Sequence, residues 1–212
     1  MKIIGLTGSI AAGKSTVAGW ISDLGIAIHD AYAAVHELLS PYGEAVAAIL
    51  AEFQPDLVGH DIGNLEKGIN RQVLGNYVFA WPQARKQLES ILHPLVRQHR
   101  DAFLDKQRSI AAPAVVLDVP LLFETGGDAV CDHIIVVHAS PATTAKRALA
   151  RAGMTPAKLA AILASQMPVD AKKKWADLCL DSDLQPEATR QDLIKWLVAV
   201  QVLVIDNDQA QS

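Results

Sequence analysis

The sequence has few cysteines and no excess of basic residues. Its two cysteines, Cys131 and Cys179, lack the spacing of a metal or redox motif, so we expect reduced thiols in the core. Lys and Arg number 19 against 23 Asp and Glu, a formal net charge of −4 that argues against a nucleic-acid partner. The short basic run Lys172–Lys174 does not reverse this balance, and we interpret it as a solvated helix face.

Long apolar runs are also missing. Half of the 212 residues are hydrophobic, yet no uninterrupted apolar stretch reaches the ~18 residues that suggest a membrane span. We therefore expect no membrane partner. Met1 leads directly into a strand-like segment, which leaves no room for a signal peptide, so we expect a cytoplasmic protein. The length suits one domain over 1–212, and we expect a monomer or a weak homo-oligomer.

A phosphate-binding motif stands near the start of the chain. Residues 8–16 read G-S-I-A-A-G-K-S-T and directly follow the apolar run 3–7. Gly8 and Gly13 can adopt backbone angles closed to other residues, which lets the loop turn its N–H groups toward a phosphate. Lys14 would reach the β- and γ-phosphates, and the Ser15 hydroxyl would hold Mg²⁺. The motif predicts a nucleoside triphosphate site, with ATP and Mg²⁺.

Strand-like segments alternate with longer helical ones along the chain. We expect strands at 2–7, 25–30, 113–119, 133–139 and 177–181. Together with the phosphate loop, this alternation predicts an α/β fold, a P-loop NTPase-type parallel sheet flanked by helices.

The segment between the second and third strands is too long for a simple crossover. It predicts helices at 31–53, 70–80 and 82–108, with a mobile or exposed loop at 54–70. We expect an inserted helical substrate lobe over 31–110. The expected core comprises 1–30, 111–141 and 171–206, the expected lid is 142–170, and Asn207–Ser212 reads as a frayed tail.

Two aspartates end predicted strands. Asp118 could hold a Mg²⁺-bound water opposite Ser15, or it could only cap a turn. Asp30 could face the γ-phosphate as a base or orienting group, or it could be the N-cap of the following helix. The residues alone leave both alternatives open.

Two arginines follow the fourth strand. A helix should open at Ser140-Pro141 and carry Arg147 and Arg151, which are four residues apart and therefore on one face. Gly153 follows, and a second helix starts near Thr155-Pro156. Such a flap could cover phosphates and exclude water during transfer, or the arginines could simply be solvated.

These motifs together resemble the dephospho-coenzyme A kinase family, from the strand at Ile3 to about Asp181. The most specific element is 119–124, V-P-L-L-F-E, which is similar to the family's Pro-Leu-Leu-Phe-Glu signature. Segment 91–95, I-L-H-P-L, resembles its His-Pro element, although a lone histidine that interrupts a helical pattern is more often structural. The lid arginines and a closing pattern near the adenine end complete the resemblance: Arg147, Arg151, Gln166, Ala176, Asp177 and Asp181.

The resemblance implies an enzyme that transfers a phosphoryl group from ATP to the 3′-hydroxyl of dephospho-coenzyme A, the last step of coenzyme A biosynthesis. The catalytic residues would be Lys14, Asp30, Asp118 and Arg147. The ATP-binding residues would be Gly8, Ala11, Ala12, Gly13, Lys14, Ser15, Thr16 and Arg151. Substrate-binding residues would be Tyr32, His93, Leu121 and Glu124, with Ser15 and Asp118 as metal ligands.

The chain departs from the family pattern at a few positions. The family's Asp-x-Asp is here Asp30-Ala31-Tyr32, and a phenol is a poor proton acceptor at neutral pH, so we expect a reduced rate. Trp175 stands where Arg is frequent. Ser9 and Ala11 replace glycines, which fits if those positions need only ordinary backbone angles. Two functions are alternatives to phosphorylation of dephospho-coenzyme A. The chain could be a kinase for another nucleotide-like alcohol, or a catalytically silent relative that binds ATP or coenzyme A.

Overall fold

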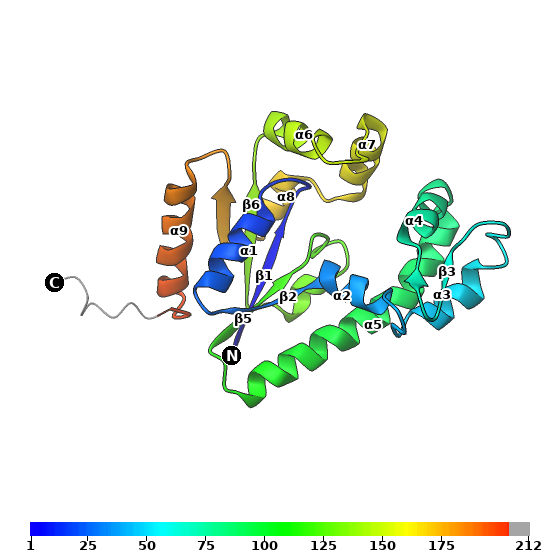
Figure 1. Cartoon of the computed structure of the whole chain (residues 1–212). Helices are drawn as coiled ribbons and strands as arrows, with labels where there is room; N and C mark the ends of the chain where they lie inside the picture. Colours follow the sequence, from blue (N-terminus) through cyan, green and yellow to red (C-terminus); the bar gives the residue numbers. More distant parts are fainter. Residues whose placement is uncertain (204–212) are drawn as a thin grey trace. The chain divides into compact units, whose positions relative to one another are not determined.

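The structure is a computed structural model that describes residues 1–203 (Figure 1). The predicted tail Asn207–Ser212 lies outside the described residues. The described part of the chain forms two compact units. Unit 1 contains residues 1–29 and 107–203, and unit 2 is Asp30–Lys106.

The main sheet has five strands in the order β2-β5-β1-β6-β7. They are β1 (Lys2–Gly8), β2 (Ala27–Asp30), β5 (Ala114–Asp118), β6 (His133–His138) and β7 (Leu178–Asp181). Strand β1 runs parallel to β5 and β6, and β6 runs parallel to β7. All five predicted strands are confirmed, and the parallel register brings the carboxyl ends of β1 and β5 to one edge of the sheet.

Helices cover the sheet of unit 1 on both faces. The helices of unit 1 are α1 (Lys14–Asp23), the 3-10 helix η1 (Gly127–Val130), α6 (Pro141–Leu149), α7 (Pro156–Ser165), α8 (Val169–Lys173) and α9 (Pro186–Ala199). Of these, α1 and α9 pack on one face of the sheet and α8 packs on the other. Successive residues of β6 enter different hydrophobic clusters because strand side chains alternate between faces. Ile135 and Val137 pack with α1 and α9, whereas Ile134 and Val136 pack with Leu122. Burial on both faces explains why the strands are almost entirely apolar.

Unit 2 is mainly helical and has its own hydrophobic cluster, which includes Val46, Ile49, Phe53, Leu57, Ile62, Ile69 and Leu74. Its elements are α2 (Ala31–Leu38), α3 (Val46–Phe53), β3 (Gly63–Asn64), β4 (Gly68–Ile69), α4 (Arg71–Ala80) and α5 (Pro82–Ser109), which continues into unit 1.

Two sequence predictions for unit 2 need correction. The single helix expected at 31–53 is divided into α2 and α3, because Pro41 and the left-handed Tyr42 (φ 59°) interrupt it. The segment 54–70 is not a simply exposed loop, since it forms the β3–β4 hairpin and buries Leu57 and Ile62 in the cluster. Helix α5 runs through Pro94 without a break.

The cysteines are only partly as expected. Cys131 is partly buried and Cys179 is exposed, and neither forms a disulfide in residues 1–203. Cys179 lies on β7, which is the last strand of the sheet and has a neighbour on one side only. Across residues 1–203, none of the helices has both the length and the apolar composition needed to cross a membrane.

Candidate functional site

The predicted phosphate loop joins β1 to α1. Gly13 is the N-cap of α1 and takes φ 93°, a left-handed conformation that favours glycine. Helix α1 starts at Lys14 without a side-chain cap and without an acidic residue in its first turn. The N–H groups and positive dipole at this helix start therefore offer a site for an anion such as a phosphate.

The structure corrects the roles expected for two loop residues. Gly8 is required by a close approach, not by its backbone angles, because a Cβ at this position would lie 2.3 Å from the carbonyl oxygen of Val137. Ala11 takes φ 58°, so the condition under which alanine would fit this position, ordinary backbone angles, is not met at Ala11. The N–H of Ala12 donates to the carbonyl of Ser9 at 3.2 Å and closes the loop.

Lys14 and Asp118 meet at the carboxyl edge of the sheet. The Nζ atom of Lys14 forms an ion pair with Oδ1 of Asp118, and Asp118 is 4% exposed. Asp118 pairs in register with Leu6, two residues before the loop begins. The structure thus brings together two residues that lie more than a hundred positions apart in the sequence.

The donors at this point fit Mg²⁺. Ser15 follows Lys14, and a hydroxyl with a carboxylate gives the oxygen ligands that this ion prefers. Residues 1–203 contain no cluster of three or more His, Cys, Asp or Glu that could enclose a metal. A site built from one or two protein oxygens, with phosphates and water supplying the rest, is the usual arrangement for Mg²⁺.

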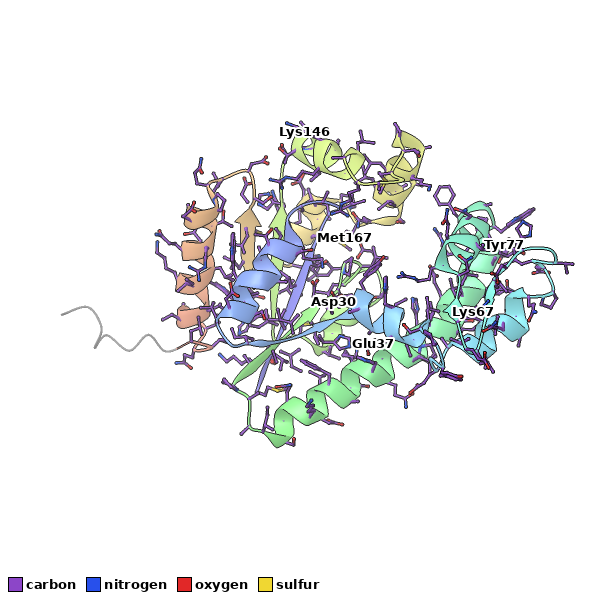
Figure 2. The ribbon with its side chains drawn as sticks, viewed as in Figure 1. Asp30, Glu37, Lys67, Tyr77, Lys146 and Met167 are labelled. Carbon is purple, nitrogen blue, oxygen red and sulfur yellow. The ribbon has the colours of Figure 1, made fainter. Side chains whose placement is uncertain are left out.

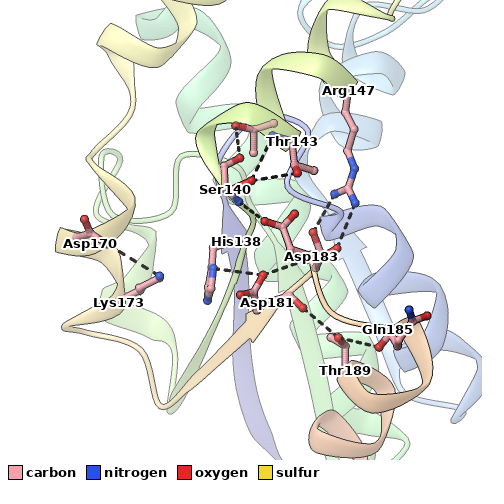
Figure 3. A network of polar contacts seen from close by, with 12 residues as sticks. His138, Ser140, Thr143, Arg147, Asp170, Lys173, Asp181, Asp183, Gln185 and Thr189 are labelled. Carbon is pink, nitrogen blue, oxygen red and sulfur yellow. Dashed lines mark hydrogen bonds and ion pairs between the residues drawn. The ribbon is translucent and has the colours of Figure 1, made fainter.

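Arg147 of α6 is held beside the phosphate loop (Figure 3). Its Nη1 donates to Ser182 Oγ at 2.8 Å and its Nη2 donates to the Ser182 carbonyl at 3.1 Å. A Cβ built on Gly13 would lie 3.3 Å from Ser182 Oγ and 3.8 Å from Arg147 Nη1. The guanidinium therefore contributes positive charge next to the start of α1.

The loop after β7 fixes the start of α6, as Figure 3 shows. Asp183 accepts a hydrogen bond from the Ser140 N–H at 2.8 Å, and Ser140 caps α6 by accepting from Thr143 N–H. Hydrogen bonds from the Ser140 backbone and the side chains of Ser140 and Thr143 lower the pKa of the Asp183 carboxyl, with a further contribution from Arg147. Neither Ser182 nor Asp183 is among the predicted site residues, although polar residues directly after a strand are a usable signal.

Arg151 is not on the helix that carries Arg147. Helix α6 ends at Leu149 with Ala150 as its C-cap, and the chain turns through Gly153, which takes φ 74°. The prediction that both arginines share one helix face is therefore wrong. Arg151 is exposed and, within residues 1–203, its side chain forms no hydrogen bond or ion pair.

Glu124 is part of a largely buried ion pair. Its Oε1 accepts from Lys172 Nζ at 2.9 Å and from Met167 N–H at 2.6 Å. Burial acts to raise the pKa of Glu124, but the bonds from Lys172 and Met167 outweigh it and lower the pKa. Lys172 is 1% exposed, so its interpretation as a solvated residue is wrong. Lys172 is one of three consecutive lysines, and the local sequence does not indicate that it is buried.

The chain between α7 and α8 touches two loops of the site. Gln166, the C-cap of α7, accepts from the Ile10 N–H at 3.1 Å through its Oε1. The next residue, Met167, donates to Glu124 as described above. The end of α7 is thereby linked both to the phosphate loop and to the 120–124 segment, in which Leu121 is half-buried.

Three predicted site residues, Asp30, Tyr32 and His93, lie in unit 2. Asp30 caps α2, since its Oδ1 accepts from the N–H groups of Tyr32 at 2.8 Å and Ala33 at 3.1 Å. The N-cap alternative for Asp30 is thus confirmed. Tyr32 is 64% exposed, and His93 is exposed on α5.

Comparison with known proteins agrees with this geometry. The sequence model of the family described as dephospho-CoA kinase matches residues 2–187. A dephospho-CoA kinase of Rhodospirillum rubrum is 48% identical over 184 residues, which cover 87% of this chain and 84% of that protein.

Two solved structures are similar over nearly the whole chain. TT1252 from Thermus thermophilus has a TM-score of 0.77 and 28% identity, covering 94% of this chain and 97% of the other. Dephospho-CoA kinase from Campylobacter jejuni has a TM-score of 0.69 and 28% identity, covering 94% and 98%. The chain therefore belongs to the dephospho-CoA kinase family.

Proposed function

We propose that this chain phosphorylates the 3′-hydroxyl of dephospho-coenzyme A with ATP, the last step of coenzyme A biosynthesis. The observation that carries the proposal is the Lys14–Asp118 pair at the start of α1, in a chain that belongs to this kinase family. A kinase site needs a cation for the phosphates and a carboxylate beside it, and this edge of the sheet supplies both.

The phosphate loop would bind the triphosphate. The N–H groups around Gly13 and the start of α1 would surround the β-phosphate, and Lys14 would turn from Asp118 to the phosphate oxygens. That exchange leaves the Asp118 carboxylate to hold Mg²⁺ together with Ser15. When bound, Mg²⁺ supplies positive charge that stabilises the charge developing on the phosphates.

The segment 142–170 would act as the lid. Arg147 already lies beside the loop and would stabilise charge on the transferred phosphoryl group. Arg151 would reach ATP only after a rearrangement of the turn at Gly153. The Gln166–Ile10 contact couples the end of the lid to the phosphate loop, so closure would order both and exclude water.

Residues 31–110 would hold the acceptor. The family resemblance assigns Tyr32 and His93 of this segment to substrate binding, together with Leu121 and Glu124 of unit 1. For Glu124 the contacts with Lys172 and Met167 favour an indirect role, in which its carboxylate fixes the segment that presents Leu121.

A product assay tests the proposal. The purified protein with ATP, Mg²⁺ and dephospho-coenzyme A should form coenzyme A, detected by its mass. Lys14→Ala should lose this turnover but remain folded by circular dichroism, with a lower melting temperature because the buried Asp118 loses its ion pair with Lys14. Lys195→Ala, an exposed lysine of α9, is the matched control and should remain active.

The outcomes separate the alternatives. Absence of coenzyme A from a folded protein that binds ATP would favour the silent relative. Phosphorylation of a different alcohol in preference to dephospho-coenzyme A would favour another kinase.

A further inference from the structure

A cationic and aromatic cluster lies on unit 2, outside the residues assigned above except for Tyr32. Arg71, the first residue of α4, contacts both ring nitrogens of His36 in α2 through its Nη1. The His36 ring lies 4.5 Å from the Tyr32 ring, centroid to centroid. Side chains that are 35 positions apart in sequence are thus gathered on one surface of this unit.

Two acidic residues close to Tyr32 and His36 in the sequence, Asp30 and Glu37, are bound elsewhere. The Asp30 carboxylate accepts the N–H groups at the start of α2, and Glu37 lies 3.2 Å from His99 of α5. Within residues 1–203, neither Arg71 nor His36 forms an ion pair with a carboxylate. An arginine keeps its charge under all ordinary conditions, so this surface carries an uncompensated positive charge.

We propose that Arg71 and His36 bind the diphosphate group of the acceptor. This inference rests on the proposed function and assigns a subsite to it. A guanidinium presents its donors in a planar fork that matches phosphate oxygens, and a histidine beside it can donate a further hydrogen bond. The exposed Tyr32 ring adds an apolar face against which the neighbouring nucleoside can pack.

The spacing along α2 supports this choice of ligand. Tyr32 and His36 are four residues apart, slightly more than one helical turn, or ~6 Å along the axis. Dephospho-coenzyme A carries its reactive 3′-hydroxyl and its 5′-diphosphate on the same ribose. If Tyr32 lies at the hydroxyl, as its place in the family's Asp-x-Asp pattern implies, the His36–Arg71 pair lies one turn further, where the diphosphate would be.

The test compares Arg71→Gln with Arg71→Lys and a matched control. Arg71→Gln should raise the KM for dephospho-coenzyme A and its Kd by calorimetry by about 10–100-fold, because a charge-assisted bond is lost. The KM for ATP should stay within about twofold. Arg71→Lys should bind dephospho-coenzyme A more tightly than Arg71→Gln but less tightly than the wild type, since lysine keeps the positive charge but lacks the planar set of donors of a guanidinium. Arg85→Gln, an exposed arginine of α5 paired with Glu89, should behave as the wild type.

Salt dependence gives a second readout that a purely structural role would not change. Wild-type affinity for dephospho-coenzyme A should fall with rising salt, and Arg71→Gln should show a weaker dependence. The inference is overturned if the wild type makes coenzyme A while Arg71→Gln binds dephospho-coenzyme A with unchanged Kd and salt dependence. A wild type that makes no coenzyme A would instead overturn the proposed function, and the inference with it.

Discussion

Tyr32 occupies the position at which the family pattern has its second carboxylate. Tyr32→Asp should raise the single-turnover rate at saturating ATP, by up to about 10²–10⁴-fold if a missing base limits the chemistry. The acceptor KM should rise as well, because a new carboxylate would stand near the cluster of His36 and Arg71. Rapid-quench measurements separate these two effects, since the rate at saturation reports transfer and not affinity.

The control for this prediction is Tyr32→Phe. It removes the hydroxyl without adding a carboxylate, so it should leave the transfer rate low. A transfer step in Tyr32→Asp that is unchanged or slower would mean that Asp30 or Asp118 already accepts the proton, or that this position lies away from the acceptor hydroxyl.

Ala11 is a residue in a conformation that favours glycine. Its φ of 58° places the backbone in the left-handed region, and this conformation costs about 1–2 kcal/mol of folding free energy for a residue other than glycine. Relief of this strain by glycine is partly offset, because glycine increases the conformational entropy of the unfolded chain. Ala11→Gly should therefore raise the free energy of unfolding by about 0.5–1 kcal/mol, measured by urea denaturation.

The matched control is Ala18→Gly, in the interior of α1. There the same substitution should lower the free energy of unfolding by about 1 kcal/mol. Equal destabilisation at both positions would show that the left-handed backbone at Ala11 stores no strain.

The Glu124–Lys172 ion pair links the segment after β5 to α8. Removing one partner leaves the other without its counter-charge, so Glu124→Gln and Lys172→Met should each cost about 3–5 kcal/mol of unfolding free energy. The double variant should be less destabilised than the sum of the two singles. A double-mutant cycle by urea denaturation measures this difference in unfolding free energy. If the two single losses add up to the loss in the double variant, the direct interaction is contradicted.

The same pair predicts a pH dependence. The pKa of Glu124 is lowered in the folded protein, so its stabilising effect is complete above the unfolded pKa of about 4.3. It is lost as the pH falls through the lower folded pKa. The difference in unfolding free energy between the wild type and Glu124→Gln should therefore shrink as the pH is lowered below about 5. Glu44→Gln, at an exposed position, is the matched control and should change the free energy of unfolding at neutral pH by less than about 0.5 kcal/mol.

For the whole molecule, patterns local in sequence were predictable and long-range contacts were not. The strands, the phosphate loop and the starts of α6 and α7 follow from apolar runs and capping residues. The burial of Lys172 depends on Glu124, which is 48 positions away, and no local pattern reports it. The left-handed Ala11 and the end of α6 before Arg151 likewise depend on how the surrounding chain packs.

This two-unit chain is expected to move a phosphoryl group from ATP to the ribose of the acceptor. The most direct measurement uses ATP labelled in its γ-phosphate, with dephospho-coenzyme A and Mg²⁺, and locates the label in the products. We expect the label on the 3′-oxygen of newly formed coenzyme A, and we expect Lys14→Ala to abolish this transfer. Label that stays in ATP or is released only as inorganic phosphate, from wild-type protein that is folded and binds both ligands, would contradict it.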